Sequence, residues 1–210
     1  MKMAGTLVRV STTAVLDRFE QAAALLLYGS LVARFWPEDL AANQLAPALL
    51  LLSEGVIVFF LIIRRASSDI SLRPQDWLAA IIGTAAPLLV VKTAEPAFLA
   101  PGVLLLLGGM AIQVTAKFSL RRSFGIVPAN RGVKTGGAYR FVRHPMYLGY
   151  MISHVGFLLL APTLWNAAVY VVCWTCLLFR IEFEEQLLSE DAGYQAFKSK
   201  VRFRLAPGLY

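Results

Sequence analysis

The sequence predicts an all-α integral membrane protein with about five to six transmembrane helices, a C-terminal helical hairpin and an interfacial tail helix. The first observation is composition: 58% of the 210 residues are hydrophobic and the mean hydropathy is +0.63, well above the values typical of soluble domains. The second is the recurrence of apolar runs close to the length that crosses a bilayer. The third is the placement of Lys and Arg in short clusters between those runs. We therefore expect one membrane domain over residues 1–210.

The first half of the chain contains four apolar runs. Residues 1–18 mix apolar, charged and hydroxyl side chains, a pattern compatible with a short interfacial helix or an irregular tail. Arg18 and Glu20 stand at the start of the first run and no clear cleavage site follows it, so no removable signal peptide is expected. The third run is short for a span and contains Pro87. The predicted spans lie at about 19–36, 45–63, 77–91 and 98–116.

The second half begins with a basic loop, expected at 117–144. Apolar runs then occupy 145–160 and 164–180. Because only three residues separate them, the two runs are expected to form an antiparallel helical hairpin. In the tail, apolar residues recur at steps of three or four with basic residues beside them, which predicts an interfacial helix.

The distribution of basic residues predicts the orientation. Cytoplasmic segments of membrane proteins carry an excess of Lys and Arg. With both termini inside, eighteen of the twenty basic residues fall on inner segments, and only Arg34 and Lys92 fall outside. The net charge of +7 is then explained by contact with an acidic lipid surface, and no nucleic-acid partner is expected.

The two cysteines, Cys173 and Cys176, have C-x-x-C spacing inside an apolar run. There is no second pair or nearby histidine to complete a zinc site. We therefore expect these thiols to pack as small apolar groups, and we expect no metal site.

The most polar stretch precedes the hairpin, at residues 136–149. Pro145 suits the first turn of a helix, which makes His144 the expected N-cap. The N–H groups and the helix dipole at this end would favour a carboxylate or phosphate beside Arg143 and His144.

A group of carboxylates, Glu182, Glu184 and Glu185, follows the last apolar run. One interpretation is a structural ring of ion pairs at the membrane surface. The other is a pocket with a helix N-terminus, Arg and His on one side and acidic residues on the other, closed by Tyr139, Tyr147 and the tail. Such a pocket suits a zwitterionic ligand that is partly cationic.

These residues form a pattern that resembles the isoprenylcysteine carboxyl methyltransferase family. The motif Gly-x-Tyr-Arg-x-Val-Arg-His-Pro-Met-Tyr-x-Gly occupies 137–149, Glu-Glu-x-x-Leu begins at Glu184, and Gly-Tyr-x-x-Phe begins at Gly193. Phospholipid N-methyltransferases share this C-terminal pattern. The resemblance covers about residues 105–207, so 98–210 is expected to form a methyltransferase core, with the helices of 1–97 in an unassigned role.

The resemblance implies S-adenosylmethionine as cofactor and a lipid-soluble or lipid-anchored methyl acceptor, reached from the membrane. The cofactor's carboxylate suits the helix N-terminus, and its ammonium and ribose hydroxyls suit carboxylates. Carried over by position, the cofactor contacts are Tyr139, His144, Pro145, Tyr147, Gly149, Glu184 and Glu185.

Methyl transfer from a sulfonium is an in-line displacement that depends on positioning and desolvation. Arg143 or Arg180 is expected to orient a carboxylate or thiolate acceptor, whereas an amine acceptor needs Glu184, Glu185 or His154 to remove a proton. The acceptor class therefore stays open among carboxylate, amine and thiol.

Two intramembrane residues are candidates for the acceptor site. Glu54 is an ionisable residue within the second run, and His154 lies two turns after Tyr147 on nearly the same helix face. Structural hydrogen bonding between helices is the alternative role for both.

Two other classes of protein compete with the methyltransferase. A membrane reductase of the steroid reductase-like type, which binds NADPH, resembles this C-terminal architecture, and a transporter or scaffold without enzymatic activity is the third possibility. The Glu184–Glu185 pair favours the methyl donor, because adjacent carboxylates repel the phosphates of a dinucleotide. Inverted halves typical of many transporters are not evident, and the sequence predicts no oligomeric state.

Overall fold

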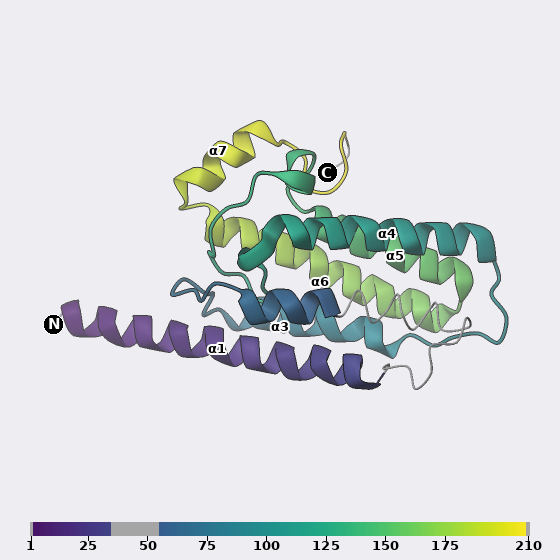
Figure 1. Ribbon diagram of the computed structural model, residues 1–210, viewed down its shortest axis with the longest axis horizontal. Helices are drawn as coiled ribbons and strands as arrows, with labels where there is room; N and C mark the ends of the chain where they lie inside the picture. Colours follow the sequence, from purple (N-terminus) through teal and green to yellow (C-terminus); the bar gives the residue numbers. More distant parts are fainter. Residues whose placement is uncertain (1, 35–54, 209–210) are drawn as a thin grey trace.

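The computed structural model describes residues 2–34 and 55–208. Most of this part is helical, and the long helices lie along one axis (Figure 1). Within these residues the only β-type pairing is an isolated bridge between Ile70 and Ala129. The predicted all-α class is therefore confirmed for the described residues. The elements are α1 (Lys2–Arg34), a helical segment at 55–63, α3 (Pro74–Ala85), η2 (Ala86–Leu89), α4 (Leu99–Leu120), η3 (Arg121–Ser123), η4 (Gly137–Arg140), α5 (Pro145–Leu160), α6 (Leu164–Leu188) and α7 (Ala192–Lys200).

Two helical stretches are long and apolar enough to cross a membrane: Leu99–Ser123 and Leu164–Leu188. Helix α5 is apolar but shorter. A helical membrane protein is consistent with these helices, whereas the total of five to six spans stays a prediction. Part of the expected 45–63 span lies outside the described residues.

The N-terminal half differs from the sequence prediction in two places. Residues 2–34 form one continuous helix instead of a short interfacial helix or irregular tail followed by a separate span, since no proline interrupts them. Helix α3 ends at Ala85, because Pro87 has no N–H to donate to the carbonyl of Gly83. The Cys173 thiol lies 3.5 Å from that carbonyl and donates to it, in agreement with the expected structural role of the cysteine.

The polar loop is shorter than expected because α4 extends beyond its predicted end at 116, whereas α5 begins at Pro145 as predicted. Helix α4 continues to Leu120 and buries Lys117, whose Nζ donates to Gln113 Oε1 at 3.1 Å and lies 5.4 Å from the centre of the Tyr150 ring.

Helix α6 continues about two turns beyond its predicted end at residue 180, to Leu188. Arg180 and the three glutamates are thus fixed on a rigid helix rather than on a loop.

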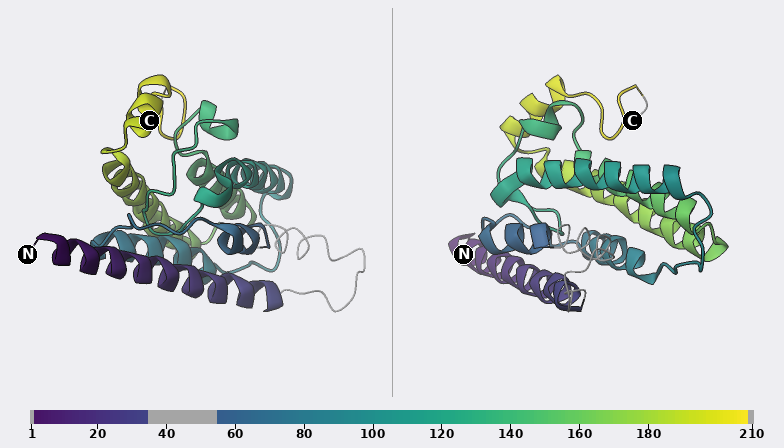
Figure 2. Two further views of the ribbon diagram at one scale, coloured as in Figure 1. Left: turned by 60° about the vertical axis from the view of Figure 1, so that its left-hand side comes forward. Right: turned by 45° about the vertical axis from the view of Figure 1, so that its right-hand side comes forward.

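Helices α4 and α5 pack with their backbones in contact. A Cβ atom at Gly149 would lie 2.7 Å from both Gln113 N and Gly109 O, and one at Gly156 would lie 2.8 Å from Gly102 O. Small residues permit this approach between apolar helices. The pair α5–α6 forms the predicted antiparallel hairpin, where the Thr163 hydroxyl accepts the Asn166 N–H at 3.1 Å and starts α6 (Figure 2).

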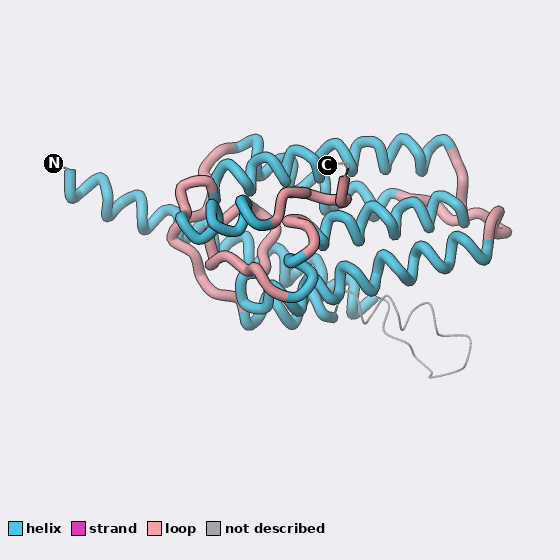
Figure 3. Tube along the Cα trace, turned by 90° about the horizontal axis from the view of Figure 1, so that it is seen from above, coloured by secondary structure: helices cyan, strands magenta, loops and turns pink. Residues whose placement is uncertain are grey.

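The two ends of the bundle differ in character. At one end the loops around 64–73 and 121–144 meet the tail and α7, and the Arg65 N–H donates to Arg122 O at 2.7 Å (Figure 3). Helix α7 is docked there by Tyr194 and Phe197, which join the same apolar core as Tyr147. The other end contains the 161–163 turn and the segment before α4.

Candidate functional site

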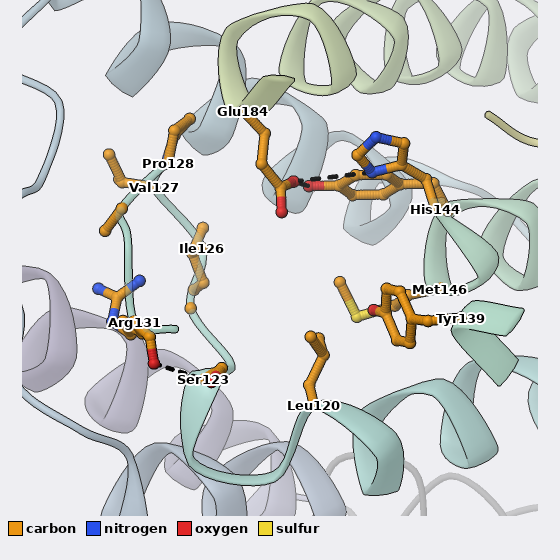
Figure 4. Close-up of a pocket in the computed structure, with 13 residues that line it drawn as sticks. Leu120, Ser123, Ile126, Val127, Pro128, Arg131, Tyr139, His144, Met146 and Glu184 are labelled. Atoms are coloured by element: carbon orange, nitrogen blue, oxygen red, sulfur yellow. Dashed lines mark hydrogen bonds and ion pairs between the residues drawn. The ribbon is translucent and has the colours of Figure 1, made fainter. Parts of the chain in front are cut away.

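A polar cavity lies at the end of the bundle where α5 begins and α6 ends (Figure 4). One wall is the loop after α4, from Ser123 to Arg131. The other walls come from η4, α5 and α6. The cavity measures about 40 Å³, which accommodates a few water molecules. Its lining residues from the latter elements are Tyr139, His144, Met146, Tyr147 and Glu184.

Glu184 faces this cavity. Its carboxylate accepts a hydrogen bond from the Tyr147 hydroxyl at 3.2 Å and lies 3.9 Å from His144 Nδ1. The His144 and Tyr147 rings stack with centres 5.7 Å apart. About a third of the Glu184 side chain remains exposed (34%), and Oε2 makes both contacts, to Tyr147 and to His144. The structure thus brings together three of the residues predicted for the cofactor site.

Glu185 has a different environment, although it is the next residue. Its side chain is buried, and Oε1 lies 2.7 Å from Arg143 Nε and 3.1 Å from His144 Nε2. Oε2 lies 3.2 Å from Arg204 Nη2 and 3.8 Å from Lys198 Nζ. Glu185 is therefore the centre of an ion-pair ring that joins α5, α6 and the tail.

Backbone hydrogen bonds also connect the tail to the start of α5. The N–H groups of Arg143 and His144 donate to Phe203 O and Arg204 O at 2.9 and 2.8 Å. Arg143 Nη1 donates to Val201 O and Arg202 O at 2.9 and 2.6 Å. His144 occupies the predicted N-cap position, but its side chain does not cap the helix because it faces the two glutamates. The geometry therefore contains both arrangements considered from the sequence: a pocket beside Glu184 and an ion-pair ring around Glu185.

The Arg180 guanidinium lies over the Tyr147 ring, 5.2 Å from the ring centre. Its Nη2 donates to Ile126 O at 2.8 Å, so it also holds the cavity loop. Tyr139 is buried beside the cavity, and this burial, with a contribution from Glu184, raises the pKa of its hydroxyl well above the ordinary value. Tyr139 is consequently a neutral hydrogen-bonding group at physiological pH.

The remaining predicted residues lie elsewhere. Pro145 starts α5, and Gly149 faces α4 at the backbone contact described above. His154 is further along α5, where its Nδ1 accepts the Trp174 indole N–H at 3.1 Å and its ring stacks on Tyr170 at 4.4 Å. Glu54 lies outside the described residues.

A buried charge cluster next to the cavity was not predicted from the sequence. It consists of Asp17 and Glu20 from α1, Arg64, and Arg131 from the cavity loop. The available signal was the pair of acidic residues three positions apart on a helix, which would face the same neighbour. Among the described residues no group of three or more His, Cys, Asp or Glu has the arrangement of a metal site.

The fold and the site together define a helical protein with two helices long and apolar enough to cross a membrane and a polar, charge-lined cavity at one end of its bundle. Comparison with known proteins identifies the class more closely. Residues 97–193 match the phospholipid methyltransferase family. The chain is also similar to protein-S-isoprenylcysteine O-methyltransferase A of Arabidopsis thaliana, with 33% identity over 100 residues.

That similarity covers 45% of this chain and 51% of the plant protein, so the match spans about half the length of each. The family-matched residues 97–193 contain the 137–149 motif and both glutamates. The resemblance to the membrane methyltransferases inferred from the motif is thereby confirmed for this part of the chain.

Proposed function

We propose that this protein is a membrane methyltransferase that transfers a methyl group from S-adenosylmethionine to a lipid-soluble or lipid-anchored acceptor. The observation that carries the proposal is the convergence of His144, Tyr147 and Glu184 on one cavity, inside the region that matches the methyltransferase family. The proposed cofactor contacts include Tyr139 at the same cavity.

The chemistry of the lining residues suits this cofactor. The Glu184 carboxylate at the cavity can accept hydrogen bonds from an ammonium group or from ribose hydroxyls. The start of α5 at Met146 and Tyr147 provides helix N–H groups and a positive dipole end for a carboxylate. S-adenosylmethionine would supply a methyl group on a sulfonium, whose positive charge is lost as the methyl group is transferred.

The surrounding residues would orient the reactants and exclude water. Arg143 acts by fixing the tail over the start of α5, since its donors are engaged by Glu185 and by tail carbonyls. Arg180, whose guanidinium lies 5.2 Å from the centre of the Tyr147 ring, is the proposed group for orienting an anionic acceptor. For an amine acceptor, Glu184 is the proposed proton acceptor.

The orientation is part of the proposal: both termini and the cavity face the cytoplasm. The concentration of basic loops at the cavity end of the bundle supports this orientation. Membrane lipids and a lipophilic acceptor are the expected partners.

Thermal denaturation in detergent tests the cofactor. S-adenosylhomocysteine should raise the melting temperature, because a ligand that binds only the folded state stabilises it, and NADPH should not. A shift with NADPH alone would instead favour the reductase. Incubation with methyl-labelled S-adenosylmethionine and host membranes, followed by separation of lipid and protein, then identifies the acceptor class.

A further inference from the structure

The N-terminal helix α1 holds one wall of the cavity. Glu20 Oε1 accepts the backbone N–H of Ile126 at 2.7 Å and that of Val127 at 3.4 Å. Ile126 and Val127 both line the cavity, across from His144 and Tyr139 (Figure 4). The backbone of this wall is therefore attached to a helix more than a hundred residues earlier in the sequence.

Arg131 connects the same wall to α1 by a second interaction, a pair of ion pairs. It lines the cavity, and its Nη2 lies 2.5 Å from Asp17 Oδ1 and 3.5 Å from Glu20 Oε2. Its guanidinium packs against Gly125, where a Cβ atom would lie 2.7 Å from Arg131 Cζ. The buried Nε of Arg131 has no hydrogen-bond partner within the described residues.

Arg64 completes the cluster by pairing with both Asp17 and Glu20. The four side chains are 0–4% exposed, and their two positive and two negative charges balance. A buried charge is tolerated when it is paired, and removal of one partner leaves the others uncompensated. The position of the loop therefore depends on the two acids of α1, which lie outside the family-matched residues 97–193.

We propose that Asp17 and Glu20 are positioning residues of the methyl-donor site. They hold the Ile126–Val127 backbone and the Arg131 guanidinium as one wall, so the N-terminal helix belongs to the donor-binding unit. This inference rests on the proposed function of the cavity.

The first test is Glu20→Gln, with Arg18→Gln as matched control because Arg18 is an exposed residue of the same helix. Titration calorimetry with S-adenosylhomocysteine should show a dissociation constant raised about tenfold or more for Glu20→Gln, and KM for the donor should rise more than kcat falls. Ligand-free hydrogen exchange should become faster in the 121–134 peptide and stay unchanged in α5. The control should match wild type in all three measurements.

A second variant, Gly125→Ala, displaces the Arg131 guanidinium without altering a charge. It should weaken S-adenosylhomocysteine binding, because the displaced guanidinium no longer holds its place in the cavity wall. It also keeps the inference testable when Glu20→Gln does not fold. Wild-type affinity in Gly125→Ala, or wild-type affinity and loop exchange in folded Glu20→Gln, would overturn the inference. Failure of the wild-type protein to bind S-adenosylhomocysteine would overturn the proposed function instead, and loop exchange without ligand would still show whether Glu20 holds the wall.

Discussion

At the scale of single residues, the two adjacent glutamates of α6 have different surroundings and so different expected roles. Glu184 is part-exposed at the cavity, with the Tyr147 hydroxyl as hydrogen-bond donor. Glu185 is buried among Arg143, His144 and Arg204. Adjacent side chains on a helix point about 100° apart, so Glu184 faces the cavity while Glu185 faces the ion-pair ring.

The first prediction compares Glu184→Gln with Glu185→Gln. Glu184→Gln should lower the affinity for S-adenosylhomocysteine about ten- to a hundredfold, the loss of a charge-assisted hydrogen bond of roughly 1.5–3 kcal/mol, with little change in melting temperature. Glu185→Gln should lower the melting temperature clearly, because it breaks a buried ion-pair network at a cost of roughly 3–5 kcal/mol. Calorimetry and a melting curve for each variant measure both effects. Equal loss of affinity at unchanged stability in the two variants would contradict this division.

The second prediction concerns two glycines of the α4–α5 pair. Gly149→Ala places a methyl group 2.7 Å from the α4 backbone and should destabilise the protein by roughly 1–3 kcal/mol through overpacking. Gly108→Ala is the matched control, since nothing lies within 4 Å of a Cβ atom there. The control should be neutral or stabilising by up to about 1 kcal/mol, because alanine is the better helix former. Equal melting temperatures for the two variants would show that α4 and α5 are not packed backbone to backbone.

At the scale of the elements, helix α7 is fixed to the cavity loop by its N-cap residue. Asp191 accepts the Tyr194 N–H at 3.0 Å as N-cap and the Asn130 side-chain amide at 2.9 Å. The hydrogen bond from Asn130, together with that from Tyr194, lowers the pKa of Asp191 below its ordinary value.

The third prediction follows from the sign of this pKa shift. A carboxyl group whose pKa is lower in the folded state stabilises that state above the unfolded pKa of about 4, and the stabilisation disappears as the pH falls through the lower folded value. The docking of α7 should therefore loosen below about pH 4, as faster hydrogen exchange in the 191–200 peptide. Asp191→Asn should remove this part of the pH dependence. Unchanged pH dependence in Asp191→Asn would assign the effect to other carboxyl groups.

The sequence predicted the helical class and the α5–α6 hairpin, because apolar periodicity and a three-residue turn are local signals. Its motifs also predicted four of the residues that line the cavity, namely Tyr139, His144, Tyr147 and Glu184, but not the Ser123–Arg131 wall. It did not predict the continuous α1, the buried Lys117 or the Asp17–Arg131 pair. These depend on contacts between residues far apart in sequence, which spacing along the chain does not record. The separation of Glu184 from Glu185 was missed for the same reason, since the tail determines which carboxylate is buried.

At the scale of the whole molecule, the directions of the helices agree with the charge asymmetry of the sequence. The 64–73 and 121–144 loops share one end of the bundle with the tail, whereas the 161–163 turn lies at the opposite end beside the segment that contains Lys92 and Glu95 (Figures 1 and 3). Thr93 and Glu95 are connected there by a hydrogen bond of 2.9 Å from the Thr93 hydroxyl. A protein that follows the positive-inside rule would place the cavity end in the cytoplasm.

The fourth prediction tests this orientation with single cysteines in a Cys173→Ser, Cys176→Ala background. The hydroxyl that Cys173→Ser introduces can still donate to Gly83 O, so the α3–α6 contact should persist. Glu95→Cys should react with a membrane-impermeant maleimide added to intact cells, whereas Glu190→Cys, exposed just after the end of α6, should react only after the membrane is opened. Equal reactivity after lysis controls for local accessibility. The opposite labelling pattern would place the cavity on the outer face, away from cytoplasmic S-adenosylmethionine, and would contradict the proposed function together with the orientation.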